Sequence, residues 1–402
     1  MPLFATKFHK PALRPDALRR VRLLGKLNSA YPLTLLSAPA GFGKTTLVSA
    51  WSQQAAVPVA WLALETEDNE FHRFLTYLIA ALRTVGPAQL GEDVLALLQA
   101  PQPLPPASLF ATLAHELNTT LPPCILVLDD YHVISAQAIH YLSAFLLEHA
   151  PTLRWIITTR ADPPLPLGRL RARGQLCELR SIDLRFTLAE ITQLLNETMQ
   201  LALSTEAVQE LETRTEGWVA GLQLAALAMQ HASERTQFVQ HFSGSHRYIV
   251  DYLTDEVLNQ LPEQTQTFLL QTSILERLCA ELCDAVIEDQ RLEIRDSSSS
   301  QSPISKLQSP VSNPRSQGML EELERANLFL IPLDDERRWY RYHHLFADLL
   351  KQRLHRRQPD MERVLHQRAA TWFAQQHLLE EAFRHATLAQ DYAHAIQLIE
   401  AH

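Results

Sequence analysis

The most restrictive feature of this sequence is a glycine-containing loop between a short apolar run and a helical segment. The loop follows Leu33–Ser37, an apolar run of strand length, and leads into the helical pattern of residues 47–54. A strand, a glycine-rich turn and a helix in this order are the context of a phosphate-binding loop, or P-loop. Its residues are Ala38, Pro39, Ala40, Gly41, Phe42, Gly43, Lys44, Thr45 and Thr46.

The residue types in this loop have a chemical reason. Glycines let the backbone curl so that successive N–H groups point at phosphate oxygens, and the helix N-terminus adds a positive dipole. We expect Lys44 to reach the β- and γ-phosphates of a nucleotide and the Thr45 hydroxyl to bind Mg²⁺. Ala38 stands where the usual pattern has glycine, which is tolerable because the position needs mainly a small residue.

Two carboxylates end a second apolar run, Ile125–Asp129, and supply a metal partner for the P-loop. Asp129 is expected to orient the water shell of Mg²⁺. Asp130 is a candidate general base that accepts a proton from an attacking water. The alternative is a surface turn after a buried strand.

A third apolar run, residues 155–159, ends in Arg160. Strand ends of a parallel sheet meet where the ligand binds. Arg160 is therefore a candidate sensor of a γ-phosphate through charge-assisted hydrogen bonds. The alternative is an exposed arginine in a solvent salt bridge.

Apolar runs that alternate with amphipathic helical segments predict an α/β P-loop NTPase core, a parallel sheet with helices on both faces. We place this core at 31–182, after a basic segment at 1–30. From Thr187 onward the pattern is helical, with a helical subdomain at 183–245 and the start of an α-helical repeat at 359–402. Between them, a helix and a hairpin predict a winged-helix domain at 246–358. The Ser- and Pro-rich stretch 294–317 predicts a disordered insertion inside it.

Composition excludes several classes of protein. The 402 residues are 46% hydrophobic and carry a net charge of −9, as expected of a soluble globular chain. Four scattered cysteines indicate a reducing compartment, and Cys279 and Cys283 have no second pair that would make a zinc site. We see no signal peptide and no membrane span, so we expect a cytoplasmic protein.

Five ordered motifs carry a resemblance to a known family: SAPAGFGKTTL, ILVLDDYH, IITTR, EGWVAGLQLAAL and RWYRYHHLFADLL. Together they resemble the MalT-like branch of the STAND ATPases, in the N-terminal part of large bacterial LuxR-family transcriptional regulators. The resemblance implies a nucleotide-dependent switch, with an ADP-bound resting state, an ATP-bound active state that self-associates, and slow ATP hydrolysis with Mg²⁺. It also implies a TPR-like repeat sensor for an inducer, which the sequence does not identify.

The resemblance assigns further residues. It implies that His343, or its neighbour His344, touches the β-phosphate of ADP. It places the segment 217–222 near the adenine, although the usual proline is absent and the alternative is a Trp that packs a helix pair. An arginine near Arg20 contacts the base, or else belongs to a solvated charge run. Because the chain ends at His402, inside the expected sensor, we expect no DNA binding from this chain alone.

Two other functions remain open. The runner-up is a turnover NTPase or kinase that acts on a separate substrate, although we find no acceptor site or lid. The third is an interaction scaffold with a decayed nucleotide site. Intact Lys44, Thr45 and Asp129 argue against decay.

Overall fold

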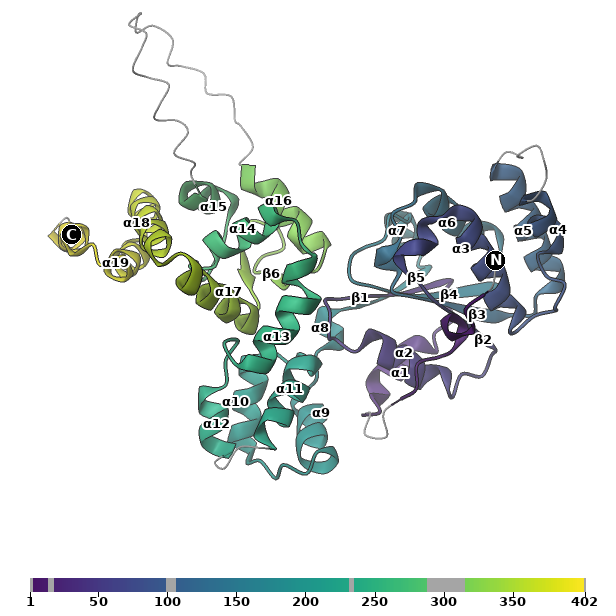
Figure 1. The fold of residues 1–402 in the computed structure, drawn as a ribbon, viewed down its shortest axis with the longest axis horizontal. Helices are drawn as coiled ribbons and strands as arrows, with labels where there is room; N and C mark the ends of the chain where they lie inside the picture. Colours follow the sequence, from purple (N-terminus) through teal and green to yellow (C-terminus); the bar gives the residue numbers. More distant parts are fainter. Residues whose placement is uncertain (1–2, 14–17, 99–105, 231–234, 288–314, 401–402) are drawn as a thin grey trace, which may run out of the picture. The chain divides into compact units, whose positions relative to one another are not determined.

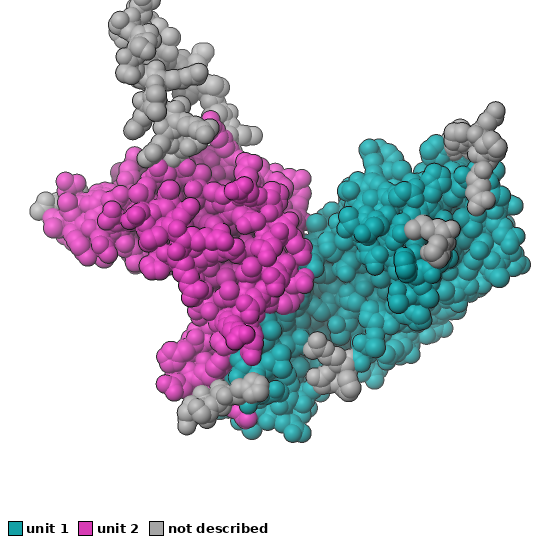
Figure 2. Space-filling view, viewed as in Figure 1, with its two compact units in different colours: residues 1–213, 217–231 teal, residues 214–216, 232–402 magenta. Residues whose placement is uncertain are grey.

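The computed structural model describes residues 3–13, 18–98, 106–230, 235–287 and 315–400. They belong to two compact units, coloured separately in Figure 2. Unit 1 consists of Met1–Thr213 and Gly217–His231, and unit 2 of Arg214–Glu216 and Ala232–His402.

Unit 1 is built on a parallel sheet of five strands in the order β2-β3-β4-β1-β5. Every residue of β1 and β3 is buried, because helices cover both faces of the sheet. The predicted α/β class and its parallel sheet are confirmed. The strands are β1 (Leu33–Ser37), β2 (Val59–Ala63), β3 (Cys124–Asp129), β4 (Leu153–Thr159) and β5 (Leu176–Arg180).

The register sets what meets at the carboxyl end of the sheet. Strand β4 lies between β1 and β3, with Leu36 paired to Thr158 and Leu128 to Ile157. The end of β4 therefore lies between the P-loop, which follows β1, and Asp129, which ends β3.

Helices cover the sheet with α3 and α6 on one face and α1 and α2 on the other (Figure 1). Helix α3 shows the predicted periodicity, since Phe74, Leu75 and Leu78 are all fully buried. Each such side chain stabilises the fold by roughly 1.5–3 kcal/mol. The helices of this α/β part are η1 (Ala5–Phe8), α1 (Val21–Leu27), α2 (Lys44–Ser52), η2 (Thr66–Asn69), α3 (Phe71–Arg83), α4 (Glu92–Leu98), α5 (Pro106–Thr120), η3 (Tyr131–Val133), α6 (Gln137–His149), α7 (Leu167–Ala172) and α8 (Ser181–Leu184).

A helical part follows in unit 1. A capping box begins it at Thr187, where the predicted helical pattern starts, since Glu190 N–H donates to Thr187 Oγ1 and Thr187 N–H to the Glu190 carboxylate. The elements are α9 (Leu188–Thr192), the π-helical turn η4 (Gln193–Thr198), α10 (Thr205–Thr215) and α11 (Val219–Met229).

Unit 2 is largely helical and contains the predicted hairpin. Strands β6 (Leu330–Pro332) and β7 (Tyr340–Tyr342) pair antiparallel, with Leu330 opposite Tyr342. The Asp334 carboxylate closes the turn by accepting the backbone N–H groups of Arg338 and Trp339, at 2.9 and 3.0 Å. The turn of the predicted hairpin therefore forms at an acidic residue.

The helices of unit 2 are α12 (Arg235–His241), α13 (Arg247–Glu256), η5 (Leu258–Gln260), α14 (Glu263–Thr272), α15 (Ala280–Ile287), α16 (Arg315–Arg325), α17 (His344–Arg357), α18 (Pro359–Gln375), α19 (Leu379–Leu388) and α20 (Tyr392–Glu400). Most of the expected disordered insertion 294–317 lies outside the described residues, namely its residues 294–314. Its last three residues are already helical, because Ser316 binds Asp284 through both its N–H and its hydroxyl, at 2.9 and 2.7 Å. In the described parts of the chain, no helix is long and apolar enough to cross a membrane.

Candidate nucleotide site

The P-loop connects the end of β1 to the start of α2. Gly41 and Gly43 have φ angles of 76° and 74°, a left-handed conformation that favours glycine. Their spacing in the sequence thus has a local reason, since both positions reverse the chain before the helix begins. The Lys44 ammonium donates hydrogen bonds to the carbonyl oxygens of Ala38 and Pro39, at 2.7 and 2.9 Å.

Lys44 is a buried cation whose charge is only partly balanced by nearby acidic groups. The pKa of Lys44 is lowered to about 8, mainly by burial and also by the charge of Arg160, while the charges of Asp130 and Asp129 oppose the shift. Its hydrogen-bond acceptors here are neutral carbonyl groups. A phosphate would supply the missing negative charge, because charge-assisted hydrogen bonds to an ammonium are the stronger kind.

Asp129 is held by two hydroxyl groups. Its Oδ1 accepts from Thr45 Oγ1 at 2.9 Å and from Thr158 Oγ1 at 2.5 Å. The pKa of Asp129 is raised to about 6, mainly by burial and also by the charge of Asp130, while the two hydroxyl hydrogen bonds and the charge of Lys44 oppose the rise. The buried carboxylate would gain from a bound cation.

Thr158 was missed by the sequence reasoning. Besides donating to Asp129, its hydroxyl accepts the backbone N–H of Asp130 at 3.0 Å. Thr158 thereby fixes both acidic residues from the neighbouring strand. The signal was present in the motif IITTR, where two polar residues end an otherwise apolar strand.

Asp130 follows the strand in a left-handed conformation, with φ of 58°. Its side chain is 49% exposed, and its Oδ1 lies 3.8 Å from Nδ1 of His132. Burial lowers the pKa of His132 to about 4, and this residue was also missed, although it stands in the motif ILVLDDYH. At neutral pH the imidazole is therefore uncharged next to an exposed carboxylate.

Arg160 follows directly on the last residue of β4. Its charge lowers the pKa values of both Lys44 and His132, so the guanidinium belongs to the same electrostatic site. The structure thus collects Lys44, Thr45, Asp129, Asp130 and Arg160 at the carboxyl end of one sheet. Thr46, the last residue of the loop, is exposed on α2.

The donor set fits a nucleotide with Mg²⁺. Mg²⁺ prefers oxygen ligands, and a hydroxyl and a carboxylate, Thr45 and Asp129, lie in direct contact here. Lys44 supplies a cation for the phosphates beside them. These residues would hold a bound Mg²⁺-nucleotide, whose contribution is a polarised phosphoanhydride.

The segment 217–222 contacts the P-loop from within unit 1. Trp218 is fully buried and donates its indole N–H to the Ala40 carbonyl oxygen at 3.0 Å. This tryptophan therefore packs against the P-loop backbone and not only between two helices.

His343 belongs to unit 2. It is buried, and its Nε2 donates to the carbonyl oxygen of Thr215 at 2.9 Å. The next residue, His344, donates its backbone N–H to Glu216 Oε1 at 3.2 Å, and Arg341 binds the same carboxylate at 2.8 and 2.9 Å. These contacts lie among residues of unit 2.

Arg20 is buried, so a solvated position is wrong for this arginine. Its guanidinium donates to the carbonyl oxygens of Leu184 and Arg185 at 2.8 and 2.7 Å, and pairs with Glu190 at 3.0 Å. It also stacks over the ring of Phe186, 4.2 Å from the centroid. The end of the basic segment thereby ties the α/β part to the helical part of unit 1.

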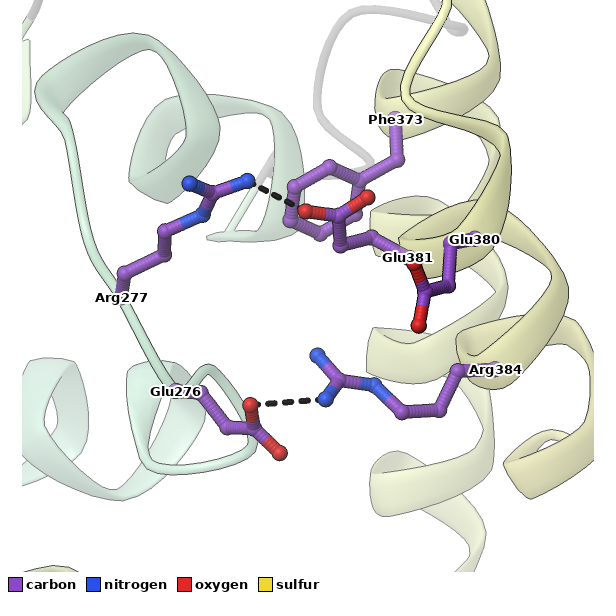
Figure 3. Close-up of a pocket in the computed structure, with 6 residues that line it drawn as sticks. All are labelled: Glu276, Arg277, Phe373, Glu380, Glu381 and Arg384. Atoms are coloured by element: carbon purple, nitrogen blue, oxygen red, sulfur yellow. Dashed lines mark hydrogen bonds and ion pairs between the residues drawn. The ribbon is translucent and has the colours of Figure 1, made fainter.

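A pocket in unit 2 differs from the P-loop site, because most of its charged side chains are paired with one another. Two ion pairs cross it, one between Arg277 and Glu381 and one between Arg384 and Glu276 at 2.7 Å (Figure 3). Four of its five charged side chains are thereby paired within the protein. Six residues line the pocket: Glu276, Arg277, Phe373, Glu380, Glu381 and Arg384.

A parallel sheet, a P-loop and an acidic partner on a neighbouring strand end define unit 1 as a P-loop NTPase core. Comparison with known proteins agrees. Residues 14–157 match the AAA ATPase domain family, and residues 254–362 match the MalT winged helix domain family. The resemblance to MalT-like STAND ATPases is confirmed, and the chain carries an ATPase domain and a MalT winged helix domain in that order.

Similar proteins cover nearly the whole chain. The HTH-type transcriptional regulator MalT of Serratia proteamaculans is 35% identical over 97% of this chain and 41% of the regulator. The serine/threonine-protein kinase PknK of Mycobacterium tuberculosis is 33% identical over 99% of this chain and 34% of the kinase. The chain therefore spans well under half the length of both proteins.

Among solved structures, a signal transduction ATPase with numerous domains (STAND) from Pyrococcus horikoshii has a tetratricopeptide repeat sensor. It matches 98% of this chain and 51% of its own, with a TM-score of 0.43 and 17% identity. This likeness is distant.

Proposed function

We propose that this chain is the ATP/ADP-binding switch of a transcriptional regulator, with an ADP-bound resting state, an ATP-bound active state and slow hydrolysis. The observation that carries the proposal is the pair of under-compensated charges, Lys44 and Asp129, at the P-loop. The MalT relatives and the order of the two matched domains support a regulator. Self-association in the ATP state and an inducer belong to this proposal.

The residues divide the work as follows. Lys44 and the loop N–H groups bind the β- and γ-phosphates, and Thr45 and Asp129 hold Mg²⁺. Asp130, exposed beside His132, accepts the proton of the attacking water. Arg160 detects the γ-phosphate from the end of β4. Slow turnover follows if Asp130 is a poor base in the resting geometry.

The role of His343 in holding ADP rests on the family resemblance. Its contact with Thr215 in unit 2 is compatible with a structural role as well. We expect His343→Ala to speed ADP release, measured as the off-rate of a fluorescent ADP analogue. An unchanged off-rate would remove His343 from the nucleotide site.

A turnover NTPase or kinase is the second candidate, and the similarity to the serine/threonine-protein kinase PknK favours it. The matched segment is only a third of that kinase, and here it carries ATPase and winged-helix matches. A steady-state rate above about 1 s⁻¹, the low end of typical enzymes, would favour this candidate.

The test begins with the protein as purified. It is denatured, and any released nucleotide is identified by chromatography, in the parent, in Lys44→Ala and in the control Lys26→Ala. Lys26 is a half-exposed lysine paired with Asp183 on the surface. We expect near-stoichiometric ADP from the parent and from Lys26→Ala, and none from Lys44→Ala.

Two outcomes would contradict the proposal. Equal amounts of retained ADP in the parent and in Lys44→Ala would contradict the assignment of the P-loop as the nucleotide site. A parent that retains no nucleotide but hydrolyses added ATP rapidly would favour the turnover enzyme.

A further inference from the structure

We propose that Trp218 and the first turn of α11 hold the P-loop in its phosphate-binding conformation, so that Trp218 is a positioning residue for nucleotide binding. This inference rests on the proposed nucleotide-binding function of the loop. Two hydrogen bonds carry it, both from the start of α11 to backbone carbonyls of the loop. The Trp218 indole N–H donates to Ala40 O at 3.0 Å, and the Ala220 backbone N–H donates to Gly41 O at 3.1 Å.

The geometry of the peptide bond gives these two contacts a consequence. A trans peptide unit is planar, and its C=O and N–H groups point in opposite directions. The Ala40 carbonyl shares a peptide unit with the Gly41 N–H, and the Gly41 carbonyl shares one with the Phe42 N–H. Drawing both carbonyls toward α11 therefore turns the N–H groups of Gly41 and Phe42 away from α11.

A loop of this kind binds phosphate through backbone N–H groups on its concave side. Gly41 has a positive φ, so the flanking peptide units are otherwise free to flip at low cost. Hydrogen bonds on the outer side remove that freedom before the ligand arrives. Preorganisation of this type improves affinity because less ordering remains to be done on binding.

The start of α11 is suited to this task. The first N–H groups of a helix have no partner within the helix. Ala220 lies in this first turn, and its N–H finds an acceptor in the P-loop. The side chain of Val219 lies against Gly43, where a Cβ would meet Val219 Cγ1 at 3.5 Å.

A tight turn places Trp218 there. Glu216 and Gly217 both have positive φ angles, 50° and 69°. A Cβ on Gly217 would lie 2.6 Å from the carbonyl oxygen of Phe186, so only glycine fits this approach. The Phe186 N–H donates to Gly217 O at 2.8 Å and fixes the turn from the other side.

The test compares two tryptophans. Trp218→Phe removes the indole N–H and keeps an aromatic ring at the site. The matched control is Trp51→Phe, since Trp51 is equally buried and loses an indole hydrogen bond of 2.8 Å to Asn28 instead of one to the loop. ADP affinity is measured by calorimetry on the full chain after removal of retained nucleotide, with thermal unfolding as the check on folding.

We expect ADP to bind about five- to tenfold more weakly to Trp218→Phe, in the range of one neutral hydrogen bond. We expect a change below twofold in Trp51→Phe, even where both variants unfold at similarly lowered temperatures. Equal affinities of the parent and Trp218→Phe would overturn the inference while the nucleotide site stands. A parent that binds no ADP would overturn the proposed function together with it.

A spectroscopic readout separates positioning from general stability. Alanine precedes glycine at only two places in the sequence, 40–41 and 220–221. Labelling with carbonyl-¹³C alanine and ¹⁵N glycine therefore selects two peptide units by NMR, and one of them, Ala40–Gly41, carries the carbonyl that Trp218 contacts. We expect the Gly41 signal of Trp218→Phe to be displaced or split without ligand, and a single signal at the parent position would contradict the positioning role.

Discussion

Two clusters of buried charges, one in each unit, differ in how completely their charges are matched. In unit 1, burial drives the pKa of Lys44 down to about 8 and that of Asp129 up to about 6. In unit 2, burial alone would raise the pKa of Glu216, but hydrogen bonds from Arg341 and the charges of His343 and Arg341 lower it to about 2.

This difference distinguishes a site whose buried charges would be matched by a bound ligand from a site whose charge is already matched by protein groups. A buried ion whose charged form is disfavoured gains when a counter-ion binds. A buried ion whose charged form is favoured already has its partners and contributes to the fold. This difference supports the proposed ligand binding at the P-loop cluster, and we propose a structural role for the Glu216 cluster.

The largest expected effect is on the complete cluster. Arg341→Ala leaves the Glu216 carboxylate buried without its bidentate partner, which is expected to cost about 3 kcal/mol of stability. The control is Arg338→Ala, an arginine that is 72% exposed, where the expected change is below about 0.5 kcal/mol. Thermal unfolding measures both, and equal small shifts would show that Glu216 is not a structural charge.

In the P-loop cluster, removal of the Asp129 charge is expected to increase the stability of the fold. With a folded pKa near 6 against about 3.9 unfolded, Asp129 binds a proton more readily in the fold. Its contribution to stability therefore falls as pH rises from about 4 to 6, and ionised Asp129 is a cost at pH 7. Asp129→Asn is expected to stabilise the nucleotide-free protein at pH 7 by on the order of 2 kcal/mol.

The measurement is the unfolding temperature of nucleotide-free parent and Asp129→Asn at pH 7 and at pH 4. We expect the gain at pH 7 to vanish at pH 4, where both proteins are neutral at this position. A loss of stability at pH 7 would mean that Asp129 is matched in the way that Glu216 is.

Thr158→Val tests the contribution of a single hydroxyl group to the P-loop cluster. The change removes the donor to Asp129 and the acceptor of the Asp130 N–H, at nearly constant volume. We expect Mg²⁺-dependent ATP hydrolysis to fall about tenfold, which is about 1.4 kcal/mol, with ADP affinity within threefold of the parent. Thr159→Val is the control, because the neighbouring hydroxyl donates to the Ala161 carbonyl instead. Equal rates in both variants would remove Thr158 from the site.

The smallest expected effect is a pH dependence of binding. ADP needs protonated Lys44, whose pKa is about 8, so we expect affinity to fall about threefold to fourfold between pH 7 and 8.5. Calorimetry across this range measures it. Lys44→Arg is the control. The guanidinium group stays protonated, so the affinity of this variant for ADP should not change with pH. A parent whose affinity is flat to pH 9 would show that Lys44 is better compensated than the structure indicates.

Much of unit 1 could be predicted from sequence. The apolar runs before the P-loop, before Asp130 and before Arg160 are buried on both faces, so they stand out as continuous hydrophobic segments. The glycines at 41 and 43 mark left-handed positions that few other residues adopt. These are local properties, and a local pattern is sufficient to find them.

Other residues could not be found in this way. Thr158 acts on Asp129 only because β4 lies between β1 and β3, and strand order is not a local property. Trp218 is 178 residues from Ala40 in the chain, and its indole could equally have packed between two helices. Arg20 is buried because Glu190 and the carbonyl groups of Leu184 and Arg185 accept its hydrogen bonds.

The sequence by itself determined the α/β class, the strand–loop–helix order around residues 38–46, the carboxylates at the end of β3 and the order of the two matched domains. Each depends on hydrophobic periodicity or on residue types that a backbone conformation requires. The tertiary structure decided which charges are matched and which are not. Charge compensation depends on burial and on partners far apart in the chain, and both exist only once the strands are ordered and the helices packed.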